Sequence, residues 1–163
     1  AMFYLSERKI IEALKQAQQR GVNIRLMIDP NKDAFGRQKN GIPNRQVASE
    51  LHAAGIPIRW CDTHGEQCHS KMLFKYNAQQ AELILGSANF TARNLKNYNL
   101  ETDMRVVGSA QAQVFKDAGQ YFDAAWSNAN SRQVTVDYAK YADESKSKYW
   151  LYRFMEWSGL STF

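Results

Sequence analysis

The chain has 163 residues, of which 44% are hydrophobic and 23% charged, a composition typical of a folded globular protein with one core. Its 21 Lys and Arg residues exceed its 16 Asp and Glu residues, and the resulting net charge of +5 suits an anionic ligand without distinguishing lipid from nucleic acid. No apolar run in these residues is long enough to span a membrane, and no signal-peptide pattern is visible.

The N-terminal region predicts a helix followed by a strand. Apolar residues recur at helical spacing between Ser6 and Gly21, so Ser6 is the expected N-cap and Gly21 the expected end. Residues 22–28 then alternate into an apolar segment, which predicts a strand that ends at Asp29.

A long connection follows, because residues 29–44 show little periodicity. Its basic side chains could line an anionic pocket, or they could be ordinary charges on a solvated loop, and both interpretations stay open. The candidate substrate-loop residues are Lys32, Arg37, Lys39 and Arg45.

The same helix-strand pattern then repeats. Asn44 is the expected cap of a helix that runs to Ala54, Gly55 ends it, and residues 56–61 predict a strand. The repeat predicts an α/β fold with a mixed, mostly parallel sheet and helices on both of its faces.

The middle of the chain predicts a hairpin. Residues 70–76 and 81–85 are short apolar strands, and the polar residues 77–80 between them form the turn. A further strand over residues 103–107 and a long helix over 110–127 complete this region.

The remaining residues are rich in aromatic side chains, so we expect a half-domain over 1–128 and a helical tail over 129–163. Trp150, Phe154 and Trp157 fall on one helical face, which must be covered. Packing against the core or against a missing partner domain is one explanation, and a helix at a membrane interface is the other.

Two cysteines flank a polar segment. Cys61 and Cys68 could close a small disulfide loop in an oxidising compartment, or they could be free thiols. A zinc site that adds His64 and His69 is disfavoured, because neither the ligand count nor the spacing is typical of structural zinc.

The most informative pattern lies between the second cysteine and residue 89. His69 and Lys71 are two residues apart, so on a strand both side chains leave the same face and can converge on one phosphate. Asn89 returns to that site from the turn after Gly86 and Ser87. This arrangement indicates a centre that cleaves phosphodiesters.

The residue types fit that chemistry. A neutral His69 can attack phosphorus if a carboxylate holds its other ring nitrogen, and Glu101 is the candidate for that carboxylate. Lys71 and Asn89 can stabilise the charge that builds on the phosphate oxygens. The scheme requires no metal and no cofactor.

These residues resemble the phospholipase D superfamily, the HKD phosphodiesterases. The resemblance rests on His69-x-Lys71, Gly86-Ser87-x-Asn89-Phe90-Thr91 and Glu101, and extends to Tyr4-Leu5-Ser6, Arg20-Gly21-Val22, the Asp29 to Arg45 loop and Arg93-Asn94-Leu95. It implies a phosphohistidine intermediate at His69, phosphate binding by Lys71 and Asn89, and orientation of a catalytic histidine by Glu101. One departure is that Tyr76 replaces the aspartate of the motif, which puts local packing and motif completeness in doubt.

The resemblance also implies a second His-x-Lys motif, which supplies the general acid, and this chain has one motif only. The second histidine is expected from a homodimer partner or from a missing N-terminal half. Because the apolar opening from Ala1 to Leu5 reads like a strand cut near its end, we interpret the chain as the C-terminal half of a bacterial two-motif protein.

The expected function is phospholipid hydrolysis or headgroup transfer. The alternatives are a metal-independent endonuclease that acts as a single-motif homodimer, and an inactive scaffold half. The lipid interpretation also implies contact with a membrane surface and a membrane-associated location in a bacterium.

Overall fold

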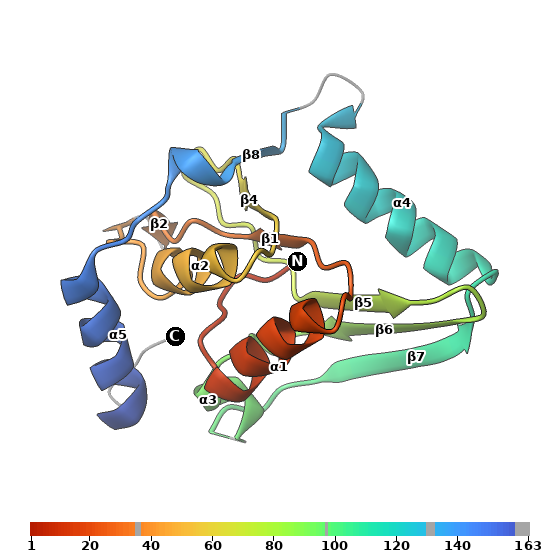
Figure 1. Ribbon diagram of the computed structural model, residues 1–163, viewed down its shortest axis with the longest axis horizontal. Coiled ribbons are helices and arrows are strands. Elements are labelled where there is room, and N and C mark those ends of the chain that lie inside the picture. Colours follow the sequence, from red (N-terminus) through yellow and green to blue (C-terminus); the bar gives the residue numbers. More distant parts are fainter. Residues whose placement is uncertain (35–36, 97, 130–132, 159–163) are drawn as a thin grey trace.

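The computed structural model describes residues 1–34, 37–96, 98–129 and 133–158 (Figure 1). Its helices are α1 Arg8–Gln19, α2 Asn44–Ala53, α3 Ala92–Leu95, α4 Gln113–Ser127, the 3₁₀ helix η2 Tyr138–Lys140 and α5 Lys146–Ser158. Its strands are β1 Leu26–Ile28, β2 Asp33–Ala34, β3 Arg37–Gln38, β4 Ile58–Cys61, β5 Met72–Tyr76, β6 Gln80–Gly86, β7 Asp103–Ser109 and β8 Thr135–Asp137.

The described strands form one sheet in the order β1-β4-β8, a second in the order β5-β6-β7 and a two-stranded sheet of β2 and β3. The α/β class is confirmed, but the expectation of a mostly parallel sheet is wrong. Among these strands β1 and β4 pair in parallel and the other pairs are antiparallel. The reason is connectivity, since a parallel pair needs a crossover such as α2, whereas short turns join β5 to β6 and force them antiparallel.

The N-terminal residues lie between the two larger sheets. Met2 forms a parallel bridge with Ile28 of β1 and an antiparallel bridge with Lys71, just before β5. The backbone N–H of Met2 also donates to the carbonyl of Met27, at 3.0 Å. The first residues of the chain therefore bring the end of β1 next to the start of β5.

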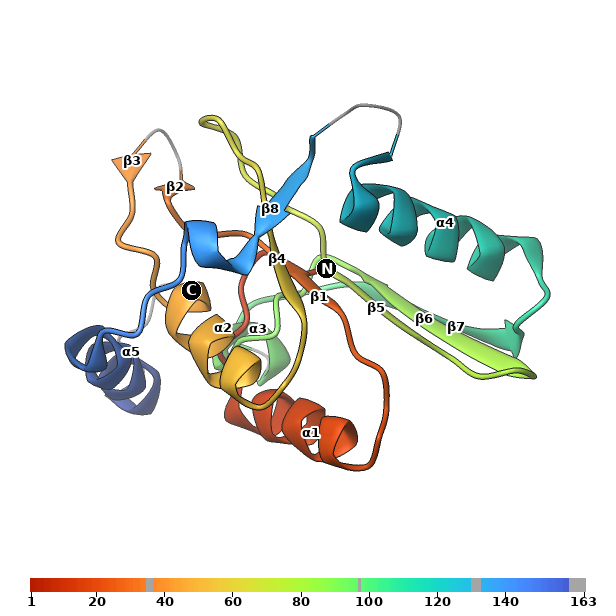
Figure 2. The same cartoon turned by 45° about the horizontal axis from the view of Figure 1, so that its top comes forward.

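Two apolar clusters hold these sheets. The larger one joins the β1-β4-β8 sheet to α1 and α2, and its largest fully buried side chains include Met2, Leu5, Ile11, Ile28, Leu51, Trp60 and Tyr152. In the smaller one α4 covers one face of β5-β6-β7, where the Phe74 and Phe115 rings stack 6.3 Å apart (Figure 2). Helices on both faces of a sheet stay a prediction.

Within the described ranges, no helix is long and apolar enough to cross a bilayer.

The region after residue 128 contributes to the larger core. Strand β8 pairs with β4, and the indole N–H of Trp60 donates to the carbonyl of Tyr138 at 2.7 Å. Tyr152 of α5 is fully buried. The division into a half-domain over 1–128 and a tail over 129–163 stays a prediction, although these contacts join both parts in one core.

Helix α5 does not bury the face that its aromatic spacing suggested. Trp150, Phe154 and Trp157 are 69%, 54% and 83% exposed, so the explanation by core packing is wrong for these three side chains. Tyr152, on the other side of the helix, enters the core, and the partly buried Tyr149 packs against it.

The expected cap of α1 is also wrong. Glu7 is the N-cap, and its side chain accepts from the backbone N–H of Lys9. The Ser6 hydroxyl instead donates to a carboxylate oxygen of Glu156 in α5, at 2.7 Å. The Ser6 hydroxyl, expected from the local sequence to cap α1, is therefore bonded to a residue distant in sequence.

Asn44 is displaced from capping in the same way. Helix α2 has Pro43 at its N-cap position, without a side-chain cap bond. The Asn44 side chain is fully buried, accepts from the N–H of Leu5 and donates to the carbonyls of Phe3 and Asp29. It therefore joins the N-terminal segment to the end of β1.

Candidate active site

The β5-β6 hairpin brings the two ends of the sequence motif together. Its turn brings the end of β6 back beside the start of β5, where the N–H of Gly86 donates to the carbonyl of Lys71 at 3.4 Å. Gly86 in turn pairs with Asp103 of β7. Residues before β5, after β6 and before β7 therefore meet at one edge of the sheet, which explains the sequence spacing of the motif.

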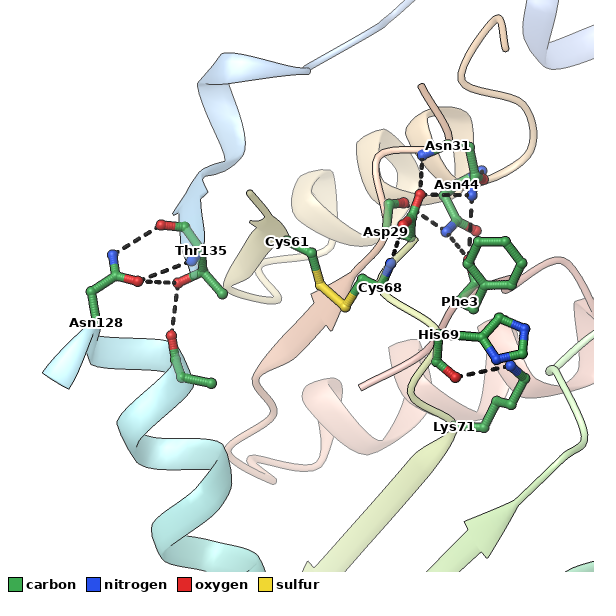
Figure 3. The surroundings of a disulfide bond; sticks show 11 residues. Phe3, Asp29, Asn31, Asn44, Cys61, Cys68, His69, Lys71, Asn128 and Thr135 are labelled. Atoms are coloured by element: carbon green, nitrogen blue, oxygen red, sulfur yellow. Dashed lines mark hydrogen bonds between the residues drawn. A yellow bond between two sulfur atoms is a disulfide. The ribbon is translucent and has the colours of Figure 1, made fainter. Parts of the chain in front are cut away.

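His69 and Lys71 meet over the ring of Phe3 (Figure 3). The His69 and Phe3 ring centroids are 4.9 Å apart, and the Lys71 Nζ atom lies 5.3 Å from the Phe3 centroid. The same Nζ donates to the carbonyl of His69 at 2.9 Å. Lys71 is buried, whereas His69 is exposed, so the imidazole remains accessible to a ligand.

The electrostatics favour a neutral imidazole. Partial loss of solvent lowers the pKa of His69 below its ordinary 6.5, and the nearby charge of Lys71 lowers that pKa further. Burial also lowers the pKa of Lys71, and the charge of Glu101 acts in the opposite direction. A neutral imidazole beside a cation is the combination that attack on an anionic phosphate requires.

Asn89 is fixed by the N-terminal segment. Its side-chain oxygen accepts from the N–H of Tyr4 at 3.1 Å, and the N–H of Phe90 donates to the carbonyl of Tyr4 at 3.0 Å. Because the amide oxygen is engaged by the backbone, the NH₂ group is the part of the side chain that can donate to a phosphate.

The Glu101 carboxylate accepts hydrogen bonds from two side chains, one on each oxygen. The Ser87 hydroxyl donates to one carboxylate oxygen at 2.5 Å, and the Asn94 side-chain amide donates to the other. Among the hydrogen bonds of the described residues, Glu101 is bonded to these two groups and not to His69. Orientation of a histidine by Glu101 therefore stays a prediction, although its charge does act on Lys71.

Gly86 is required by close packing. A Cβ atom at this position would lie 2.3 Å from the backbone oxygen of Thr102 and 2.3 Å from a carboxylate oxygen of Asp103. A side chain here would push β6 away from the segment that carries Glu101. Gly86 therefore allows β6 to pack closely against the start of β7.

Sequence reasoning missed a buried polar network behind His69 (Figure 3). Asp29 is 1% exposed, and its carboxylate accepts from the N–H of Cys68 at 2.8 Å and from the N–H of Asn31 at 2.7 Å. Asn31 and Asn44 both donate to the carbonyl of Phe3. The available signal was the position of Asp29 at the carboxyl end of a predicted strand, where site residues of α/β proteins gather.

Cys61 and Cys68 form a disulfide, so the free-thiol alternative is wrong for this structure. Because both sulfur atoms are bonded to each other, neither is a thiolate ligand, and the zinc site with His64 and His69 is excluded. In the part of the chain that is described, no group of three His, Cys, Asp or Glu side chains could hold a metal. The disulfide ties the end of β4 to the residue before His69.

Two of the four candidate loop cations lie over one aromatic ring. Lys32 and Arg45 lie over the ring of Tyr141, at 5.8 and 5.2 Å from its centroid. Lys39 is exposed, and the side chain of Arg37 falls outside the described part of the structure. Whether these residues contact substrate stays a prediction.

Tyr76, at the position of the motif's usual aspartate, ends β5. It is 64% exposed, and its ring stacks on Phe74 at 5.1 Å. The departure from the motif therefore lies at the far end of β5, away from His69.

Comparison with known proteins gives one family. The sequence model described as "Cardiolipin synthase, PLD-like domain" matches residues 1–126, which include every motif residue discussed above. A search of curated proteins finds no match.

Proposed function

The chain belongs to the PLD-like domain family of the cardiolipin synthase type, within a superfamily of phosphodiesterases, and from this premise we propose that it is one half of an enzyme acting on phospholipids. The observation that carries the proposal is the convergence of His69 and Lys71 on Phe3, with a lowered pKa for the imidazole. Phospholipid is favoured as the substrate because the matching family is described as cardiolipin synthase.

In the proposed reaction a ring nitrogen of neutral His69 bonds to phosphorus while the bond from phosphorus to the leaving oxygen breaks. Lys71 and Asn89 stabilise the negative charge on the phosphate oxygens. The leaving alkoxide takes a proton from a second histidine. Water or an alcohol then gives a proton back to the second histidine and displaces His69 from phosphorus, which gives hydrolysis or headgroup transfer, respectively.

The second histidine comes from another HKD half, which is either an N-terminal half of the same protein or a homodimer partner. Large apolar side chains next to Glu101 support a contact there. Tyr98, Leu100 and Met104 are 75%, 103% and 62% exposed. Exposed apolar groups beside a site are a common mark of an interface that completes it.

The test is cleavage by the complete protein of phosphatidylglycerol in mixed micelles and of a soluble phosphodiester, bis(p-nitrophenyl) phosphate, in the presence of EDTA. His69→Ala should abolish turnover of both substrates. His64→Ala is the matched control, because His64 is an exposed histidine in the turn closed by the disulfide, and it should leave turnover unchanged. Retained activity in His69→Ala would remove His69 from the nucleophile role.

Two further outcomes would change the proposal. A symmetric dimer in gel filtration that cuts DNA in EDTA and spares lipid would favour the endonuclease alternative. A folded protein, complete with its second half, that turns over none of these substrates would favour the scaffold alternative.

A further inference from the structure

Helix α5 carries an exposed apolar strip. Its four members are Trp150, Leu151, Phe154 and Trp157, which are 69%, 46%, 54% and 83% exposed. At about 100° per residue these positions fall within one third of the helix circumference, and thirteen residues extend for about 20 Å. In both views α5 lies at the periphery of the molecule, on the side away from α4 (Figures 1 and 2).

The opposite side of α5 is anchored to the domain. Tyr152 is fully buried, and its hydroxyl accepts from the Arg8 guanidinium at 3.4 Å. Glu156 accepts from the hydroxyl of Ser6 at 2.7 Å. These contacts fix the rotation of the helix, so the apolar strip is held outward as a property of the fold.

The charges on α5 are arranged unequally. Its one carboxylate, Glu156, is turned to Ser6, whereas Lys146 is exposed and Arg153 is partly exposed. By helical rotation Lys146 and Arg153 lie beside Trp150 and Trp157 on the same edge of the strip. The outward part of α5 thus presents aromatic side chains bordered by cations.

More cations gather at the start of α5. Lys32, Arg45 and Lys140 lie 5.8, 5.2 and 5.6 Å from the centroid of the Tyr141 ring. Lys148 of α5 reaches the same region, where its Nζ donates to the carbonyl of Asn40 at 3.4 Å. Asp62 and Asp143 pair with Lys140 and Lys148, so these two cations are partly neutralised.

We propose that the exposed strip of α5 docks the protein on a bilayer that contains anionic phospholipid, with α5 lying in the plane of the interface. Tryptophan and phenylalanine bordered by Lys and Arg are the side chains that suit this position, because the rings enter the headgroup boundary and the cations meet lipid phosphates. The inference rests on the proposed function for its phospholipid substrate, and it adds a membrane-associated location. Docking would hold the site on the surface where that substrate resides.

The test is cosedimentation of the complete protein with vesicles of phosphatidylglycerol and phosphatidylcholine, compared with phosphatidylcholine alone. Binding should be stronger with the anionic vesicles. Trp150→Ser and Trp157→Ser should each weaken it roughly tenfold, because each removes a large apolar side chain from the interface. Val114→Ser, at a residue of α4 that is 44% exposed, is the matched control and should bind as the unaltered protein does.

A second set of variants tests the cations, Lys146 and Arg153, that border the apolar strip. Lys146→Glu combined with Arg153→Glu should abolish the preference for anionic vesicles, and Lys116→Glu, at an exposed position of α4, should not. Unchanged urea unfolding of the variants checks that the exposed substitutions leave the fold intact. Equal vesicle binding by the protein and its tryptophan variants would overturn the inference. A dimer in sedimentation equilibrium that Trp157→Ser dissociates would also overturn it, because the strip would then be a protein interface.

Turnover of bis(p-nitrophenyl) phosphate separates this inference from the proposed function. The α5 variants should cleave this soluble substrate at the unaltered rate. His69-dependent cleavage without vesicle binding would refute the docking surface alone. Vesicle binding that needs the tryptophans, in a protein that cleaves neither lipid nor soluble phosphodiester, would refute the proposed function alone.

Discussion

Replacement of Asp29 tests whether the buried network behind His69 stabilises the fold and the site. In Asp29→Ala the backbone N–H groups of Cys68 and Asn31 lose a charged acceptor, at 2.8 and 2.7 Å respectively. The Asn31 side-chain amide loses the same acceptor, at 3.3 Å. A hydrogen bond to a charged group contributes about 1.5 to 3 kcal/mol, so the loss of the two backbone bonds alone should lower the free energy of unfolding by about 3 to 6 kcal/mol. Asp29→Asn keeps one acceptor oxygen and should cost about half as much.

The measurement is urea unfolding of both variants followed by tryptophan fluorescence. Asp123→Ala is the control, since this carboxylate pairs with Arg25 but is 62% exposed and should contribute less than about 1 kcal/mol. Asp29→Ala should also slow cleavage of a soluble phosphodiester through kcat, because one of the N–H groups that it releases belongs to Cys68, the residue before His69. A change in the free energy of unfolding below about 1 kcal/mol in Asp29→Ala would refute this reasoning.

Three further predictions concern the site and its support. Because burial and Lys71 lower the pKa of His69 below 6.5 and only neutral imidazole attacks phosphorus, the acid limb of the pH-rate profile should have its midpoint below pH 6.5; an acid limb centred above pH 6.5 would contradict the assignment. Reduction of the Cys61–Cys68 disulfide, whose cysteines are seven residues apart, should lower the free energy of unfolding by about 2.4 kcal/mol, whereas a Cys61→Ser, Cys68→Ser variant should not respond to reductant. Gly86→Ala should cost about 1 to 3 kcal/mol in urea unfolding and slow turnover, while Gly119→Ala in α4, whose Cβ would meet its nearest atom at 3.6 Å, should not destabilise; equal stability of the two would refute the packing role of Gly86.

The hairpin was predictable from the sequence because its determinants are local. Two short apolar segments and the polar turn between them predict β5 and β6, and the structure has both strands joined by a turn in this region. The approach of Lys71 to Gly86 follows from that register. The part of the candidate site that lies on the hairpin was therefore accessible to sequence reasoning.

Capping and burial were less predictable, because they depend on partners distant in sequence. Ser6 and Asn44 are both good N-caps by residue type, but each bonds to a group brought in by the tertiary fold. Helical periodicity likewise placed Trp150 and Trp157 on one face of α5 without deciding whether that face is covered. Local rules describe what a side chain can do, and tertiary competition decides which partner it takes.

The sequence by itself determined which residues can perform phosphodiester chemistry and, through the hairpin, that Lys71 and Gly86 meet. Only the tertiary structure decided that Phe3 lies beneath His69 and Lys71 and that Asp29 holds Cys68. The physical reason is that these contacts depend on the order of strands in space. The N-terminal segment enters between β1 and β5, and no local spacing of residues specifies that neighbour.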